Sequence, residues 1–376
     1  MASLPPLRSS PAYSSSSTPI TPLPKNGHIS TPDPAYASSQ TKASLDSALV
    51  SIWKHKAWPT FRHAWDTLLP PTPVQLTWPR DGREVLTSFQ HVPVRDGHKV
   101  EIKIYRRPDV TPGAAMVFRM HGGGWATGGH GMEEAENLYL AFRHEVVVVS
   151  VAYRLAPEWP FPTGVRDCFD VLRWCISNAT TLAIDPDRII TIGGSAGGNL
   201  SAVMALMARD APIPGIVGQI LNFPITCHPR YFASLSKNRG YELASYVQNR
   251  DDSLLSAVQM EFFWDCYGTE KGDEVEGDGE GEGYHSPLLR QDLEGLPPAL
   301  IQVGGLDVLR DEGIAYGEAL RAARNEVEVY AYRGLPHVFN VFCDLPQREE
   351  YYKRQDEFIE RLLGGEVGGC EVVSHC

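Results

Sequence analysis

Apolar runs of five to eight residues recur along the chain from residue 116 onward, and stretches with apolar residues at helical spacing separate them. Several runs are apolar on both faces, as buried parallel strands are. The runs span residues 116–120, 146–153, 188–192, 218–223, 299–305 and 327–332. The helical stretches span residues 131–144, 164–179, 198–209, 311–324 and 349–363. This alternation predicts an α/β fold with a doubly wound, mostly parallel sheet.

Three further patterns surround this core. Two alternating runs within residues 89–106 flank the turn dipeptide Asp96-Gly97, which predicts a β-hairpin at the edge of the sheet. Apolar positions at helical spacing over residues 38–69, interrupted at Pro59, predict a small helical region. Residues 231–284 contain helical material without a clear strand, so we interpret them as an inserted cap.

The chain therefore divides into six predicted segments. Residues 1–37 begin with 18 Ser, Pro and Thr among the first 32 positions, and such a composition predicts disorder. The other five are an N-terminal helical cap segment (38–88), the first part of the α/β core (89–230), the cap insertion with an acidic loop (231–284), the second part of the core (285–365) and a flexible tail (366–376).

The formal net charge of −12 has the wrong sign for the basic surface of a nucleic-acid-binding protein. Half of it falls within residues 270–282, where acids alternate with glycines, and we interpret this run as a solvated surface loop. The seven cysteines include no Cys-x-x-Cys pair, so neither a metal site nor a disulfide framework is indicated.

The first residues lack the continuous apolar run of a secretory signal, and a cytoplasmic location is the default expectation. Residues 189–208 are uncharged over about the length of a membrane span. Four glycines in the middle of this run favour a buried strand, a tight turn and a buried helix instead. We therefore expect no transmembrane segment.

The strongest chemical motif is Gly193-Gly194-Ser195-Ala196-Gly197-Gly198, placed between a predicted strand and a predicted helix. In that context Gly-x-Ser-x-Gly is typical of a nucleophile elbow, where side chains flanking the serine would collide with the strand and the helix. Ser195 is therefore the candidate nucleophile. A phosphate loop is the other functional interpretation, but no Gly-Lys-Ser/Thr follows.

A second motif, His121-Gly122-Gly123-Gly124-Trp125, follows another predicted strand. Preorganised backbone N–H groups stabilise the negative charge that develops on a carbonyl oxygen during acyl transfer. We assign the N–H groups of Gly123, Gly124 and Ala196 to an oxyanion hole.

A nucleophilic serine needs a histidine to remove its proton and a carboxylate to orient that histidine. Asp307 and His337 each follow a late predicted strand, in the order Ser, acid, His that such a sheet places together. Asp311 and Glu312 are competing acids, but they should already belong to the next helix.

These motifs together resemble the hormone-sensitive-lipase branch of the α/β-hydrolases. The matching segments, in order, are HGGGW (121–125), YRLAPE (153–158), DPDRI (185–189), GGSAGGN (193–199), HSPL (285–288), GLDVLRDEG (305–313) and the His337 segment. The resemblance implies carboxylic ester hydrolysis of a small-molecule ester without a cofactor, under a cap made of N-terminal helices and the 231–284 insertion. It also implies that His121 supports the oxyanion loop, and a homodimer is compatible with it.

The sequence departs from the family pattern at two positions. Gly194 stands before the nucleophile where the family usually has Asp or Thr, and Trp159 replaces a common His. Neither departure touches the triad, but Gly194 removes a side chain beside the elbow, which bears on substrate preference.

Three functions remain open from the sequence. The first is hydrolysis of esters with small or medium acyl chains, with a role in secondary metabolism suggested only by the resemblance. The second is non-catalytic binding of a small molecule, as in related plant receptors that lost the histidine which this chain keeps as His337. The third is formamide or lactone hydrolysis, because the same triad serves each of these bonds.

Aromatic residues of the predicted cap either line the acyl pocket or pack in the core. They are Trp53, Trp58, Trp65, Phe262, Phe263 and Trp264.

Overall fold

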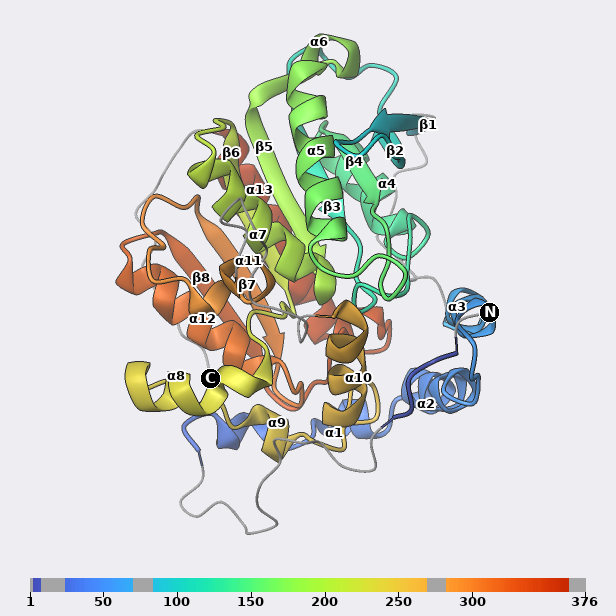
Figure 1. Ribbon diagram of the computed structural model, residues 1–376, viewed down its shortest axis with the longest axis vertical. Helices are drawn as coiled ribbons and strands as arrows, with labels where there is room; N and C mark the ends of the chain where they lie inside the picture. Colours follow the sequence, from blue (N-terminus) through green and yellow to red (C-terminus); the bar gives the residue numbers. More distant parts are fainter. Residues whose placement is uncertain (1–2, 8–23, 70–83, 269–281, 365–376) are drawn as a thin grey trace.

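The computed structural model describes residues 3–7, 24–69, 84–268 and 282–364. Its centre is an eight-stranded sheet in the order β1-β2-β4-β3-β5-β6-β7-β8 (Figure 1). The strands are β1 (Leu86–Pro93), β2 (Lys99–Arg106), β3 (Ala114–Met120), β4 (Val147–Ala152), β5 (Ile184–Gly194), β6 (Ile216–Asn222), β7 (Ala299–Gly304) and β8 (Val327–Tyr332). From β4 to β8 all neighbours are parallel, while β1 and β2 form an antiparallel hairpin that pairs with β4. The predicted sheet and its hairpin edge are confirmed.

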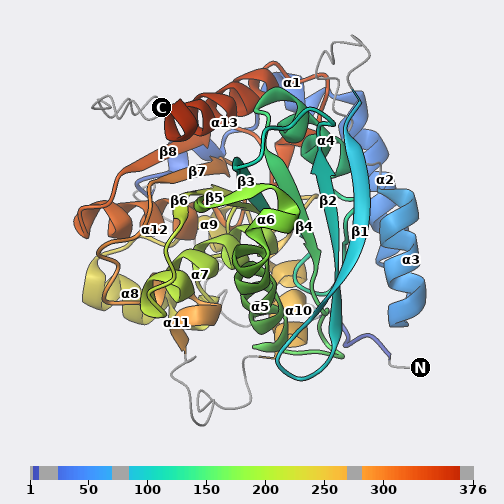
Figure 2. The ribbon, with the colours of Figure 1, turned by 90° about the horizontal axis from the view of Figure 1, so that it is seen from above.

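Helices cover both faces of the sheet (Figure 2). On one face lie α4 (Glu134–Arg143) and α13 (Gln347–Gly364); on the other lie α5 (Thr163–Ser177), α7 (Ala196–Asp210) and α12 (Arg310–Ala322). The uncharged run at residues 189–208 forms the end of β5 and most of α7, as expected. Within the described residues, no helix is both long and apolar enough to cross a bilayer.

Further helices lie beyond the carboxyl ends of the strands (Figure 1). They are α1 (Pro34–Ala37), α2 (Gln40–Ile52), α3 (Trp58–Leu68), α8 (Phe232–Arg239), α9 (Ser245–Gln248) and α10 (Ala257–Tyr267). The short helices α6 (Ala179–Leu182) and α11 (Glu282–His285) complete the set of α-helices in the described chain. The predicted break at Pro59 is wrong by a few residues, because the proline occupies the first turn of α3, where its missing N–H costs nothing.

Arg62 of α3 joins the N-terminal helices to the core. Its guanidinium makes two hydrogen bonds to Glu158, at 2.9 and 2.7 Å, and donates to the carbonyl oxygens of Ala126 and Ala156, both at 2.7 Å. A planar guanidinium suits such a set of acceptors because its donors have a fixed geometry. Arg62 therefore fixes α3 beside the loop that follows β3.

Residues 24–37 correct the prediction of a disordered tail over residues 1–37. Ile29 and Tyr36 are buried, and the backbone of this segment pairs with the loop after β8. The N–H of Gly334 donates to the Ile29 carbonyl at 2.9 Å, and the N–H of Asp33 donates to the Gly334 carbonyl at 3.0 Å. The burial of these two side chains and the backbone pairing stabilise the segment, despite the disorder that its composition predicts. The rest of the predicted tail, apart from residues 3–7, lies outside the described residues.

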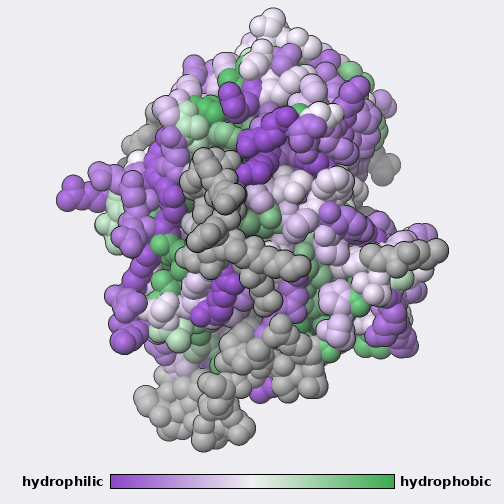
Figure 3. Space-filling view, viewed as in Figure 1, coloured by the Kyte–Doolittle hydropathy of each residue, from purple (hydrophilic) through white to green (hydrophobic). Residues whose placement is uncertain are grey.

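The acidic run and the C-terminal tail also lie almost wholly outside the described residues, so their predictions stay untested. On the face shown in Figure 3, hydrophilic residues predominate, and hydrophobic residues form separate small areas between them.

The backbone pairing between Gly334 and the N-terminal segment predicts that one methyl group added at Gly334 lowers the free energy of unfolding measurably. Gly334 has φ +68°, and a Cβ there would lie 2.3 Å from the Asp33 nitrogen. Gly295 has a similar φ of +73°, and no atom of the described residues lies within 4 Å of the added Cβ, so Gly295→Ala is a matched control for backbone strain alone. We expect Gly334→Ala to lower the unfolding free energy by about 1–3 kcal/mol more than Gly295→Ala does in urea titration. Equal losses would show that the segment does not hold this loop.

Candidate active site

Ser195 sits at the junction of β5 and α7 in a strained backbone conformation, with φ 57° and ψ −118°. A Cβ at Gly193 would lie 2.3 Å from the Gly197 carbonyl carbon, and one at Gly197 would lie 2.1 Å from the Met120 carbonyl oxygen. Only glycine fits at these two positions. The close approach places Ser195 at the start of a helix, where the first N–H groups have no partner within the helix.

The loop after β3 lies directly beside this turn. Gly123 and Gly124 have φ values of 101° and 59°, and added Cβ atoms there would lie 2.4 Å from the Thr127 carbonyl oxygen and 2.3 Å from the Phe263 ring. The Thr127 N–H and hydroxyl both donate to the Gly123 carbonyl, at 3.0 and 2.8 Å. The loop is therefore held in a conformation that only glycines adopt without strain.

His121 packs behind the loop rather than facing Ser195. Its ring stacks on Tyr153 with centroids 4.3 Å apart, and its Nδ1 lies 2.8 Å from the Gly122 carbonyl oxygen. Burial lowers the pKa of His121 to about 4, so the imidazole is neutral at pH 7 and Nδ1 can carry the proton of that hydrogen bond. The supporting role of His121 stays a prediction, which these contacts make reasonable.

Asp307 and His337 meet at the carboxyl ends of β7 and β8. His337 Nδ1 lies 2.7 Å from Asp307 Oδ2, and the other carboxylate oxygen accepts the Leu309 N–H at 2.9 Å. Asn249 fixes the acid's loop by donating to the carbonyl oxygens of Gly305 and Asp307. A buried carboxylate bonded to Nδ1 leaves Nε2 as the nitrogen that can accept a proton.

The two competing acids have structural partners elsewhere. Asp311 pairs with the Arg310 guanidinium at 2.7 Å and accepts the N–H groups of Ala244 and Ser245, both at 2.8 Å. Glu312 accepts the Thr226 N–H at 2.7 Å. Within the described structure, Asp307 is the one of these three acids that contacts His337.

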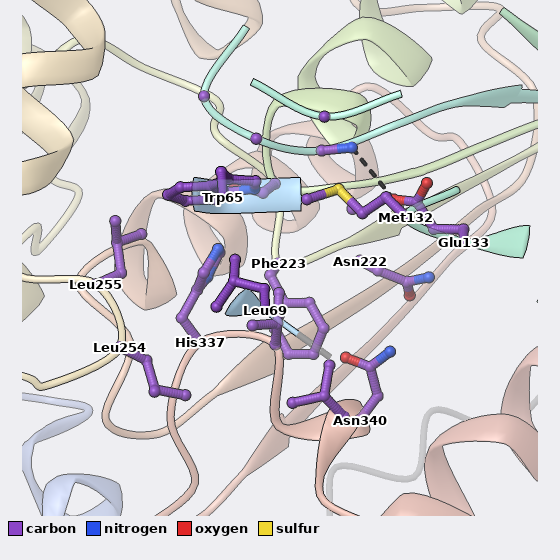
Figure 4. Close-up of a pocket in the computed structure, with 18 of the residues that line it drawn as sticks. Trp65, Leu69, Met132, Glu133, Asn222, Phe223, Leu254, Leu255, His337 and Asn340 are labelled. Carbon is purple, nitrogen blue, oxygen red and sulfur yellow. Dashed lines mark hydrogen bonds between the residues drawn. The ribbon is translucent and has the colours of Figure 1, made fainter. Parts of the chain in front are cut away.

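A cavity of about 490 Å³ brings the candidate residues together. Ser195, His337 and the glycines of the oxyanion loop line it, with leucines of α2 and side chains of α3 and α10. Figure 4 shows that Leu254 and Leu255 lie on the side of His337, whereas Met132, Glu133 and Asn222 lie on the opposite side.

The aromatic residues of the predicted cap divide between the two roles expected for them. Trp65 and Phe263 line the cavity. The other four pack against neighbouring rings: Trp53 on Phe61 and Phe262, Trp58 on Phe262, and Trp264 on Trp125.

Glu133 is a site residue that the sequence reasoning missed. Its Oε1 accepts the Gly122 N–H at 3.2 Å, marked by the dashed line in Figure 4. Its Oε2 is buried and has no hydrogen-bond partner among the residues that the structure describes. Burial raises the pKa of Glu133 to about 7, an effect that Arg119 partly offsets. No motif marks this residue, because it lies among ordinary acids at the start of α4.

A model of the family described as "alpha/beta hydrolase fold" matches residues 117–341. The chain belongs to this family. The carboxylesterase NlhH of Mycobacterium tuberculosis is 38% identical to this α/β-hydrolase over 238 residues, which cover 61% of this chain and 68% of that protein. The expected hormone-sensitive-lipase-like branch is confirmed.

Solved structures agree with this placement of the α/β-hydrolase. The structure titled bacterial heroin esterase superposes with a TM-score of 0.72 at 28% identity, covering 89% of this chain and 98% of that one. The structure titled vibralactone cyclase gives a TM-score of 0.75 at 26% identity, covering 90% and 96%. With its esterase relatives, this α/β-hydrolase is a carboxylic ester hydrolase.

The raised pKa of Glu133 predicts a specific pH dependence of stability. As pH rises above the ordinary value of 4.5, the unfolded chain loses this proton first, so the folded state loses stability up to about pH 7. Glu133→Gln removes this loss. Relative to the variant, we expect the unfolding free energy of the wild type to fall by on the order of 2 kcal/mol between pH 5 and pH 8.

Urea titration at several pH values measures this difference. The control is Glu294→Gln, which changes an exposed carboxyl group on the surface. A difference between wild type and Glu133→Gln that stays constant across the pH range would contradict the assignment.

Proposed function

We propose that this enzyme hydrolyses esters of small or medium acyl chains through a Ser195-His337-Asp307 triad and an acyl-enzyme intermediate. The observation that carries the proposal is the 2.7 Å contact between His337 Nδ1 and buried Asp307, in a cavity that also contains Ser195 at the strained turn. These are the parts that acyl transfer requires.

In the first half of the proposed reaction, Ser195 Oγ attacks the ester carbonyl carbon while His337 Nε2 takes its proton. The N–H groups of Gly123, Gly124 and Ala196 stabilise the oxyanion. His337 then donates the proton to the leaving alcohol as the carbon–oxygen bond breaks. In the second half, His337 deprotonates water, which attacks the carbonyl carbon of the acyl-enzyme. The bond from this carbon to Ser195 Oγ then breaks, His337 returns the proton to Oγ, and the acid leaves.

The cavity supports a substrate of moderate size. Its volume of about 490 Å³ lies within the ordinary range for small-molecule sites. Apolar side chains of Leu45, Leu49 and Leu69 line part of it and suit an alkyl chain. The small-molecule ester therefore stays the expected partner, while the homodimer, the cytoplasmic location and the role in secondary metabolism stay predictions.

The alternative of a non-catalytic binder is less well supported. A binder has no need of a histidine oriented by a buried carboxylate, or of a serine held at positive φ. Such strain persists at functional sites because the surrounding structure enforces it.

The likeness to a structure titled vibralactone cyclase gives specific grounds for a second reaction on lactones. In this reaction a hydroxyl group of the acyl chain replaces water, attacks the acyl carbon and releases the acyl group from Ser195 as a lactone. In the reverse reaction, Ser195 attacks the lactone carbonyl and opens the ring. The same triad and oxyanion hole serve both directions. The formamide alternative stays a prediction.

The proposed nucleophile is tested with Ser195→Ala. We expect this variant to lose hydrolysis of p-nitrophenyl acetate and butyrate, and also fluorophosphonate labelling, because no other group replaces the Ser195 hydroxyl. Ser201→Ala is the control, since Ser201 is buried in the middle of α7 away from the elbow. Labelling that persists in Ser195→Ala would contradict the assignment.

The proposed acid is tested with Asp307→Asn. We expect kcat to fall on the order of 10³- to 10⁴-fold with a smaller change in KM, because an amide favours the wrong tautomer of His337. Asp311→Asn and the wild type provide the comparison, and circular dichroism verifies folding. Equal losses of kcat in the two variants would show that Asp307 has no special role.

A further inference from the structure

A buried chain of hydrogen bonds lies under the nucleophile turn, on the face of the sheet covered by α4 and α13. Its members are Tyr332, Gln302, Asn222, Gln355 and Glu136. The Tyr332 hydroxyl donates to Gln302 at 2.6 Å, and each later side chain donates to the next at 3.2 Å. The chain ends where Glu136 pairs with Arg119 at 3.1 Å.

The cavity extends to this network. Arg119, Glu136 and Asn222 all line it, although each is at most 3% exposed. With Glu133 they form one arm of the cavity, which we call the polar arm. The leucines beside His337 belong to the other, apolar part (Figure 4).

Gly194 opens the polar arm. Unlike its neighbours Gly193 and Gly197, it has room for a side chain, because within the described structure an added Cβ would meet only the Asn222 carbonyl oxygen, at 3.8 Å. Its φ is not in the left-handed region. Packing and backbone strain thus explain the other glycines of the elbow but do not require this one. What the glycine provides is space between Ser195 and Asn222, and both residues line the cavity.

The polar arm contains a hydrogen-bonding group with no role inside the described protein, on Glu133, which lines the cavity. Within the described part of the chain, Glu133 Oε2 is buried without a hydrogen-bond partner, which is costly unless another group satisfies it. Arg119 pairs with Glu136, so their charges offset each other, and burial raises the pKa of Glu133 to about 7, which favours its neutral carboxyl form. A neutral group that can both donate and accept fits this arm better than an ammonium or a carboxylate.

The position of His337 indicates which part of the substrate reaches the arm. His337 must protonate the leaving alcohol, so the alcohol lies on its side of Ser195. Glu133 and Asn222 lie across the cavity from His337, so we place the acyl group on their side (Figure 4).

We propose that the polar arm is a subsite for a hydroxyl group carried on the acyl chain of the substrate. The enzyme is then selective for hydroxyacyl esters over their unsubstituted counterparts. This proposal rests on the proposed function, since it assumes that Ser195 receives the acyl group. Gly194 is the residue that admits the hydroxyl group, and Glu133 Oε2 is its hydrogen-bond partner.

The test compares kcat/KM for matched pairs of p-nitrophenyl esters. The pairs are butyrate with 3-hydroxybutyrate, and hexanoate with 3-hydroxyhexanoate and 5-hydroxyhexanoate. Release of p-nitrophenol is followed after subtraction of the uncatalysed rate, so hydrolysis and ring closure are both counted. For the wild type we expect at least one hydroxy ester to exceed its plain partner by about three- to tenfold, the gain from one net hydrogen bond.

Variants at Gly194 fill the arm in two steps. Gly194→Ala should lower the preference for the hydroxy ester, and Gly194→Val should bring the ratio close to one. Gly364→Ala is the matched control, because its added methyl group meets no described atom within 4 Å and Gly364 does not line the cavity, so it should keep the wild-type ratio. Each ratio is taken within one variant, so a general loss of rate does not alter it.

A wild-type ratio of one or less for every pair would overturn the proposal, as would a preference that survives in Gly194→Val. If Gly194→Val does not fold, the wild type and Gly194→Ala decide the result. Hydrolysis of the plain esters without a hydroxyl preference rejects the subsite alone. Absence of both turnover and fluorophosphonate labelling in the wild type rejects the proposed function itself.

Discussion

The contact of the elbow with the end of β3 is the constraint on which the site depends. Gly197 of α7 comes so close to the backbone of Met120 and His121 that no Cβ fits between them. This contact sets Ser195 directly beside the loop of Gly122, Gly123 and Gly124. The proposed nucleophile and oxyanion hole are therefore neighbours because two backbones touch, and their geometry does not depend on long flexible side chains.

The parts of the site around this contact are held from different directions. Tyr153 holds His121 from below the loop by stacking and by a hydrogen bond to its carbonyl oxygen at 2.8 Å. Arg62 ties the N-terminal helices to the residues that follow the loop. On the far side, residues 24–37 pair with the loop that leads to His337. The strained backbone at Ser195 persists because all of these supports are buried or paired.

Much of this arrangement could be predicted from the sequence, and the reasons differ between elements. The strands can be predicted because buried parallel strands are continuously apolar. Ser195 can be predicted as the nucleophile because its motif lies between a predicted strand and a predicted helix. The ordered structure of residues 24–37 cannot be predicted in this way, because it depends on the burial of Ile29 and Tyr36 against parts of the chain that are distant in the sequence. The polar arm cannot be predicted from the sequence for the same reason. Arg119, Glu133 and Asn222 come from three separate segments, and the fold brings them to one cavity. Gly194 was noticed as a departure, but the space it leaves could not be judged without its neighbours.

The central claim is that Ser195 carries the acyl group during turnover. The most direct measurement is acid quenching of the enzyme within milliseconds of mixing with p-nitrophenyl butyrate, followed by peptide mapping with mass spectrometry. The account predicts one butyryl group on the peptide that contains Ser195, formed together with a burst of p-nitrophenol and absent from Ser195→Ala. Turnover without any acylated peptide, or with the butyryl group on another residue, would contradict it.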